Sequence, residues 1–275
     1  MKRMTITTRL LVAFTAAVLC LVSAEPILAA TALASESIPE GPAGVAMRNA
    51  AAQDKYLFVY FWKQSDPPTQ AMRAVFEKAA GQMNDVADAI SVQITDASNA
   101  AMVKKFGVSR APMPLALAIA PNGAITRGLP VKFDEQQLKA SVVSRGTSHC
   151  LKALQDRKLV LLCVKHQTGP NDFPGAYEFT QDERYSAASQ IVRIDPSDSS
   201  EHGFLQSLKI DPSADQGVMV VLSPPGQPVA TFKSDVTKDQ IIERLAAASA
   251  SCCPGGQCGP GESCCPGGNC EPATK

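Results

Sequence analysis

Aromatic residues and long apolar runs are scarce in this chain. Phe, Trp and Tyr make up 5% of its 275 residues, and Trp62 is the single tryptophan. No run of eighteen apolar residues follows the N-terminal segment, which excludes a membrane-spanning helix in the mature chain. An excess of charge is also missing, because 26 basic residues balance 26 acidic ones. This balance gives no electrostatic reason to expect nucleic acid as a partner.

Cysteine is absent from most of the chain. Three of the nine cysteines are Cys20, Cys150 and Cys163, so residues 21–149 contain none. The other six form a twelve-residue duplication of Cys-Cys-Pro-Gly-Gly-x-Cys near the C-terminus: Cys252, Cys253, Cys258, Cys264, Cys265 and Cys270. Thiols are the most reactive groups of this protein, and the sequence places most of them where little apolar material could form a core.

The first 24 residues have the pattern of a signal peptide. Basic residues at positions 2, 3 and 9 precede an apolar stretch over 10–22 that is too short to span a bilayer comfortably. Val22 and Ala24 fit the small positions before a cleavage site, so we predict cleavage after Ala24. Removing this segment takes away three basic residues and leaves a net charge of −3. We expect an exported protein, periplasmic or secreted, in an oxidising compartment.

The pattern after the signal peptide predicts an α/β unit. Residues 25–40 are small and polar and are expected to form a linker, and residues 41–145 form the first domain. The continuous apolar run over 56–62 is typical of a strand buried on both faces, and Asp66 followed by two prolines is typical of a helix start. The expected order is helix 45–53, strand 56–62, a helix from 67, strand 89–95, helix 99–106, strand 115–120, strand 124–131 and helix 134–144. Helices alternating with strands predict parallel pairing, and Asn122-Gly123 predicts a hairpin that adds an antiparallel edge.

The same order returns in a second domain over residues 148–249. The expected elements are helix 150–155, strand 158–165, helix 181–189, strand 190–195, helix 201–208, strand 217–222, strand 229–233 and helix 238–248. Pro224-Pro225-Gly226 is expected to turn the chain between the last two strands. Two such units in succession suggest duplication at the level of the fold.

The first unit resembles the thioredoxin family at two segments. Residues 61–69, Phe-Trp-Lys-Gln-Ser-Asp-Pro-Pro-Thr, are similar to the family stretch that ends in Trp-Cys-Gly-Pro-Cys. Asp66 and Thr69 stand at its two cysteine positions, with Pro67 and Pro68 between them. Residues 106–114 resemble the segment before a core strand that carries the family's cis proline, which makes Pro114 the candidate for that residue.

The second unit resembles the family more loosely. Thr168, Gly169, Pro170 and Asn171 stand where Cys-Gly-Pro-Cys would be, and no proline precedes Val218. The resemblance implies an α/β fold of two tandem thioredoxin-like domains, each a central mixed sheet flanked by helices, followed by a disordered tail rich in Cys, Gly and Pro over 250–275.

The family's chemistry requires residues that both domains lack. Thiol–disulfide exchange needs a thiolate attacker at a helix N-terminus, and neither Asp66, Thr69, Thr168 nor Asn171 can attack a disulfide. We therefore expect no catalytic residue at these degenerate positions. Two interpretations remain open: a retained scaffold with a helix cap, or a groove at Trp62 and Pro114 that binds an extended peptide or envelope protein by strand addition.

Cys150 and Cys163 are the only cysteines inside a domain. Cys163 lies in a predicted buried strand, and Cys150 begins the helix before it. They are expected either to form a disulfide or to remain buried and inert. His149 and His166 lie near them, but a lone histidine is more often an ordinary surface or core residue than a catalytic one.

The tail allows three interpretations. Its six cysteines could form a disulfide knot, which the exported location favours. Their thiolates could bind a soft metal, Cu(I) or Zn(II), as the only cofactor that the sequence suggests. They could also act in redox chemistry. The expected function is a non-catalytic binding or scaffold protein with metal handling by the tail, and the alternative is a thiol–disulfide oxidoreductase that uses the tail cysteines.

Overall fold

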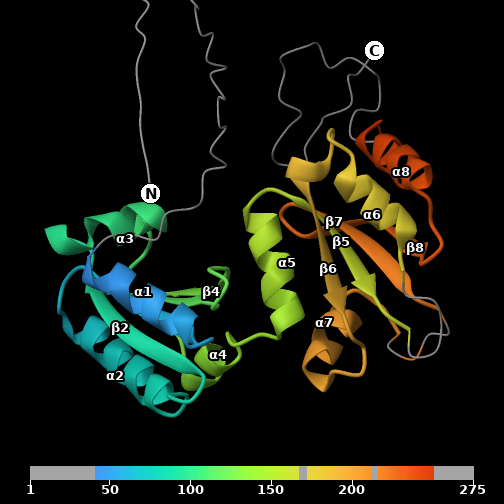
Figure 1. The fold of residues 1–275 in the computed structure, drawn as a ribbon. Helices are drawn as coiled ribbons and strands as arrows, with labels where there is room; N and C mark the ends of the chain where they lie inside the picture. The colour runs from blue at the N-terminus through green and yellow to red at the C-terminus, as the bar shows by residue number, and fades with distance from the viewer. Residues whose placement is uncertain (1–40, 167–171, 212, 214–215, 251–275) are drawn as a thin grey trace, which may run out of the picture. The chain divides into compact units, whose positions relative to one another are not determined.

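The computed structural model describes residues 41–166, 172–211, 213 and 216–250. They form two four-stranded sheets, each flanked by helices (Figure 1). The predicted signal peptide, the linker, residues 168–171 and the cysteine-rich tail lie outside the described residues. Within the described part, no helix is long and apolar enough to cross a membrane.

The first sheet has the strand order β2-β1-β3-β4. Strand β1 pairs in parallel with β2 and antiparallel with β3, and β3 pairs antiparallel with β4. Both central strands are buried over nearly their whole length, as the apolar sequence of β1 predicts. The elements are α1 (Pro42–Ala52), β1 (Tyr56–Trp62), α2 (Pro67–Gly81), β2 (Ala87–Gln93), η1 (Ala97–Asn99), α3 (Ala100–Lys105), η2 (Val108–Arg110), β3 (Leu115–Ile119), β4 (Ile125–Pro130) and α4 (Glu135–Lys139).

Alternating side chains of β1 supply two cores, one on each face of the sheet. Tyr56, Phe58 and Tyr60 pack with residues of α2 and α4 on one face. Leu57 and Phe61 pack with residues of α1 and α3 on the other. This period of two is the reason that a single strand can anchor helices on both sides.

The second sheet repeats the arrangement with the order β6-β5-β7-β8. Helices α5 and α7 contribute to the core on one face, and α6 and α8 contribute to the core on the other. The elements are α5 (Arg145–Gln155), β5 (Leu159–Val164), α6 (Pro174–Gln181), η3 (Ser186–Ala188), β6 (Ser189–Ile194), η4 (Ser199–Glu201), α7 (His202–Ser207), β7 (Val218–Ser223), β8 (Gln227–Lys233) and α8 (Lys238–Ala250).

The central pairing corrects the expectation of parallel strands. Only β1 with β2 and β5 with β6 are parallel in the described sheets. Helix α3 has six residues and therefore spans about 9 Å, whereas a seven-residue strand such as β1 spans roughly 23 Å. The segment between β2 and β3, which contains the short helix α3, brings the chain to the end of β1, where Leu115 pairs with Phe61, so β3 begins where β1 ends and runs antiparallel to it.

The helix predicted over 181–189 is wrong. Helix α6 begins at Pro174 and ends at Gln181, because Pro174 is preorganised for a first helical turn and the apolar face formed by Ala176 and Phe179 ends there. Residues 182–188 are mostly polar and supply no continued stripe that a helix could bury.

The helix predicted over 134–144 is shorter than expected. Asp134 and Gln137 form a capping box at the start of α4, which ends at Lys139. The Tyr56 hydroxyl donates to the Val143 carbonyl at 2.8 Å and accepts from the Val143 N–H at 3.1 Å. This contact takes both main-chain groups of Val143 out of helical pairing, and α5 then begins at Arg145, earlier than predicted.

Candidate functional site

The start of α2 carries Asp66 and Thr69, the two positions that the sequence resemblance compares with redox cysteines. Asp66 is the N-cap of α2, and its carboxylate accepts a hydrogen bond from the Thr69 N–H at 2.9 Å. Hydrogen bonds from Thr69 lower the pKa of the exposed Asp66 carboxyl. Thr69 is buried, and its carbonyl accepts a hydrogen bond from the Tyr60 hydroxyl at 2.5 Å. These residues stabilise a helix start and contain no nucleophile suited to disulfide exchange.

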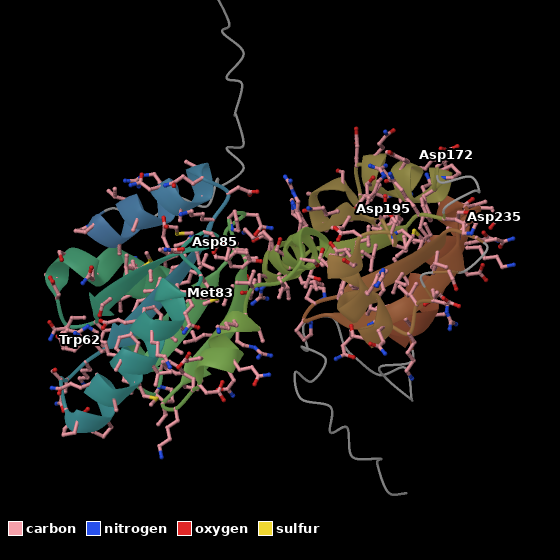
Figure 2. All side chains as sticks on the ribbon, turned by 90° about the horizontal axis from the view of Figure 1, so that it is seen from below. Trp62, Met83, Asp85, Asp172, Asp195 and Asp235 are labelled. Atoms are coloured by element: carbon pink, nitrogen blue, oxygen red, sulfur yellow. The ribbon has the colours of Figure 1, made fainter. Side chains whose placement is uncertain are left out.

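Trp62 and Pro114 face each other at the end of the sheet where α2 begins. Phe61 pairs with Leu115, so the antiparallel register places the next residue of β1, Trp62, opposite Pro114. Both alternate onto the face that carries α2 and α4, where Trp62 packs partly buried against the core. Pro114 is buried, and the Met113–Pro114 peptide bond is cis. Figure 2 shows Trp62 on the first unit.

Met113 leaves an unpaired main-chain segment beside this pair. Among the described residues, its N–H and C=O have no hydrogen-bond partner, although β3 begins only two residues later. The Pro114 carbonyl is already occupied, because the Val131 N–H donates to it at 2.7 Å. A donor and an acceptor on one residue next to a strand end are the groups that pair with an added strand.

Val131 lies against this segment in an unusual conformation. Its φ is 65°, in the left-handed region that β-branched residues rarely adopt, and its side chain is 46% exposed. The hydrogen bond from its N–H to the Pro114 carbonyl ties this conformation to the segment before β3. No sequence pattern predicts this conformation, because Val131 is only the last residue of the strand predicted over 124–131.

Arg73 of α2 lies over the aromatic residues of the same site. Its guanidinium carbon is 4.7 Å from the centre of the Trp62 ring and 5.7 Å from that of Tyr60. Its Nε and Nη2 atoms are buried without a hydrogen-bond partner. Burial raises the pKa of Tyr60 to about 12, and the positive charge of Arg73 opposes that shift. The sequence interpretation identified Trp62 and missed Arg73.

The corresponding loop of the second unit lies outside the described residues. Beside it, Tyr177, Lys165 and Arg193 contribute to an open cavity of about 640 Å³ that two carboxylates, Asp172 and Glu178, also line. Arg193 stacks over the Tyr177 ring with its guanidinium carbon 4.9 Å from the ring centre. Two basic and two acidic side chains line this cavity, so it favours neither an anionic nor a cationic ligand.

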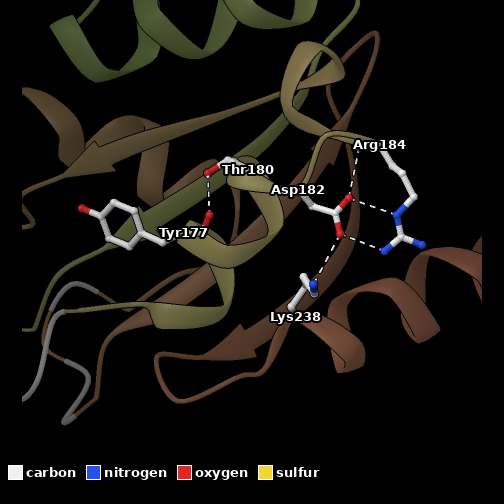
Figure 3. A network of polar contacts seen from close by, with 5 residues as sticks. All are labelled: Tyr177, Thr180, Asp182, Arg184 and Lys238. Carbon is white, nitrogen blue, oxygen red and sulfur yellow. Dashed lines mark hydrogen bonds and ion pairs between the residues drawn. The ribbon is translucent and has the colours of Figure 1, made fainter.

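A polar network fixes the end of α6 in the second unit (Figure 3). The Asp182 carboxylate accepts hydrogen bonds from Arg184 at 2.8 and 3.0 Å and from Lys238 at 3.3 Å. These contacts, led by the bond from the Arg184 side chain, hold the pKa of Asp182 well below its usual range. The network links α6 to the start of α8 and is structural.

Cys150 and Cys163 are both free and buried, so the disulfide considered for them does not form in this structure. The physical reason is their position on opposite faces of the second sheet. Cys150, a residue of α5, packs in the core between α5, α7 and the sheet, and Cys163, a residue of β5, packs in the core beneath α6 and α8. Burial raises the pKa of each thiol to about 12, so neither is a thiolate at neutral pH.

No group of three or more metal-ligating side chains occurs in the part of the chain that the structure describes. The six tail cysteines lie outside that part. His149 contributes to the lining of a surface cavity, and no described metal cluster includes it.

The strand order of both sheets, with helices on both faces and a cis proline before β3, is that of two successive thioredoxin-like folds. No family model matches the sequence, and no curated protein matches it. Among solved structures, the germline-specific thioredoxin Deadhead of Drosophila melanogaster is similar at 15% identity over 38% of this chain and 93% of that one, with a TM-score of 0.30.

Other solved structures match a larger share of this chain. The first two thioredoxin domains of Saccharomyces cerevisiae Eps1p match at 11% identity over 76% of this chain and 97% of theirs, with a TM-score of 0.29. The zinc-bound form of human ERp44 matches at 12% identity over 72% of this chain and 57% of that chain, with a TM-score of 0.32. At these identities the similarity concerns the fold and carries no activity across.

Proposed function

We propose that this protein is an exported, non-catalytic thioredoxin-like binding protein. Its first domain, residues 41–145, docks an extended peptide segment of an envelope or secreted protein at the surface formed by Trp62, Met113, Pro114 and Val131. Its second domain, residues 148–249, is a divergent copy, and the tail handles soft metal ions or is closed by disulfides. The N-terminal sequence pattern supports export.

The unpaired main chain of Met113 is the observation that carries this proposal. An incoming strand satisfies the Met113 N–H and C=O, which no described residue of the chain pairs. Trp62 and the exposed side chain of Val131 supply apolar contact on either side. Asp66 and Thr69 at the cysteine positions remove the exchange reaction but leave the surface intact, so binding without turnover is the activity that the residues support.

A single nuclear magnetic resonance signal tests the docking site. Trp62 is the only tryptophan, so its indole N–H gives one resolved peak in the ¹⁵N-labelled protein. We expect seven-residue peptides of alternating Val and Thr to shift that peak and the Met113 amide peak in a saturable manner. Met113→Pro removes the donor and is expected to abolish the shift, while Met102→Leu in the buried core is the matched control. Peptides that leave both peaks unmoved contradict the proposal.

A further inference from the structure

Arg73 is a cation with an incomplete set of partners. Its guanidinium carbon lies 4.7 Å from the centre of the Trp62 ring and 5.7 Å from that of Tyr60, and no hydrogen bond joins the guanidinium to either residue. Nε and Nη2 are buried without an acceptor, whereas Nη1 is not among the buried atoms. Among the described residues no carboxylate forms an ion pair with Arg73. Asp66 and Glu77 lie close enough to raise the pKa of Tyr60, yet neither bonds to the guanidinium.

Such a group is unusual in a folded protein. Buried polar atoms nearly always have hydrogen-bond partners, and each unsatisfied one is costly. A guanidinium carries five N–H donors in a planar fork that matches a carboxylate. The missing acceptor therefore points to a ligand that carries an anionic oxygen pair.

The position of Arg73 places this group at the proposed docking surface. Side chains of a helix lean towards its N-terminus, so Arg73 reaches from the second turn of α2 towards the end of β1. There it covers Trp62, which the strand register sets opposite Pro114. A peptide strand paired with Met113 passes this point, and a side chain of the peptide can meet the accessible Nη1 end of the guanidinium.

We propose that Arg73 is an acid-recognising subsite, which selects extended peptides with a Glu or Asp side chain directed at Trp62. This inference rests on the proposed function and names its ligand class. The carboxylate binds at Nη1, and a rotation of the guanidinium on the Trp62 face brings Nη2 to the second oxygen. The peptide thus supplies the acceptor that α2 and β1 lack.

Two matched peptide sets test this subsite. Both sets are seven-residue Val-Thr repeats with acetylated and amidated ends. One set carries a single Glu at each position in turn, and the other set carries Gln at the same positions. Binding is measured by Trp62 fluorescence and by the indole peak at low ionic strength. We expect Glu at one position to tighten binding about tenfold over Gln, the size of a charge-assisted hydrogen bond at a half-exposed site. Added salt is expected to reduce this advantage.

Variants assign the effect to Arg73. Arg73→Gln is expected to remove the preference for Glu, Arg73→Lys to retain part of it, and the exposed control Arg127→Gln to retain all of it. If Arg73→Gln does not fold, the wild-type comparison and Arg73→Lys decide the question. Equal binding of the Glu and Gln sets, or a Glu preference that survives in Arg73→Gln, overturns the acid subsite alone. Peptides that fail to perturb Trp62 in either set overturn the docking surface as well.

Discussion

At the scale of single residues, Val131 has a strained backbone conformation within the proposed docking surface. A β-branched residue in the left-handed region is destabilised, and such strain concentrates at sites with a function. The hydrogen bond from Val131 to Pro114 ties this conformation to the segment that presents Met113. Removal of this strain is therefore expected to raise the free energy of unfolding and, at the same time, to weaken peptide binding.

Val131→Gly is expected to stabilise the protein and to weaken peptide binding. The strain removed is worth roughly 1–3 kcal/mol, and the added freedom of the unfolded chain costs about 0.4–1 kcal/mol, so we expect a net gain of about 1 kcal/mol. Urea denaturation followed by circular dichroism measures it. Val45→Gly is the control, because Val45 is equally exposed but helical and its replacement destabilises. Loss of stability in Val131→Gly would show that the strain is absent.

Tyr60 couples the first core to the start of α2. Its hydroxyl is buried and bonds to the Thr69 carbonyl, so Tyr60→Phe is expected to cost about 1 kcal/mol. Burial raises the pKa of Tyr60 in the folded state to about 12, above the value of 10.0 for an exposed tyrosine. The folded state retains the phenol proton longer than the unfolded state, so this stabilisation is complete below pH 10 and is lost as the pH rises towards 12.

Denaturation as a function of pH separates this contribution from other groups. Between pH 10 and 12 the wild type is expected to lose stability more steeply than Tyr60→Phe. Tyr56, whose pKa burial also raises, is present in both proteins and cancels in the comparison. Parallel curves for the two proteins would contradict the assignment.

At the scale of elements, the start of α5 depends on a glycine and a buried carboxylate. The Gly146 N–H donates to Glu201 at 2.7 Å, and the Ser144 hydroxyl donates to the other oxygen at 2.5 Å. A negative charge at a helix N-terminus is favourable. A Cβ on residue 146 would lie 2.5 Å from Glu201 Oε1 and 2.8 Å from Ile194 Cγ1, which leaves room for glycine alone.

Gly146→Ala is expected to destabilise the protein by about 1–3 kcal/mol, the usual cost of overpacking a filled site. Gly203→Ala in α7 is the matched control, since no atom lies within 4 Å of its added Cβ. Alanine in an open helical position is expected to stabilise by up to about 1 kcal/mol. Thermal unfolding of both variants gives the comparison, and similar shifts in the two would refute the close packing at Gly146.

The elements themselves were largely predictable. The apolar run of β1 and the Asp66-Pro67-Pro68 start of α2 were predicted at the residues where they occur, because local burial pattern and capping chemistry determine them. The end of α4 and the position of α6 were not, because Val143 is held by Tyr56 from far along the chain, and the burial of Phe179 depends on a sheet formed by other segments.

At the scale of the whole molecule, the positions of the cysteines determine which thiol–disulfide chemistry the protein can perform. In the described residues the only cysteines are buried on opposite faces of one sheet, each with a raised pKa. Any exchange reaction of this chain therefore depends on cysteines outside the described residues, Cys20 or the six of the tail.

The full-length protein is expected not to accelerate the reduction of insulin by dithiothreitol. Asp66→Cys with Thr69→Cys is the positive control, because it restores a thiol pair at the start of α2, with one exposed and one buried position, and is expected to gain activity. Acceleration by the wild type that disappears when the tail cysteines are changed to Ser would support the oxidoreductase alternative. Native and reduced intact masses then distinguish a disulfide knot from bound copper or zinc.

The sequence by itself determined the α/β class, the two successive units and the absence of cysteine from residues 21–149, because burial periodicity, helix caps and residue identity are local properties. Only the tertiary structure decided that β3 runs against β1, that Cys150 and Cys163 lie on opposite faces, and that Arg73 and Val131 meet Trp62 and Pro114 at one end of a sheet. Those facts depend on which distant segments pack together. A site made of contacts between α2, β1 and the start of β3 becomes visible only when the chain is folded.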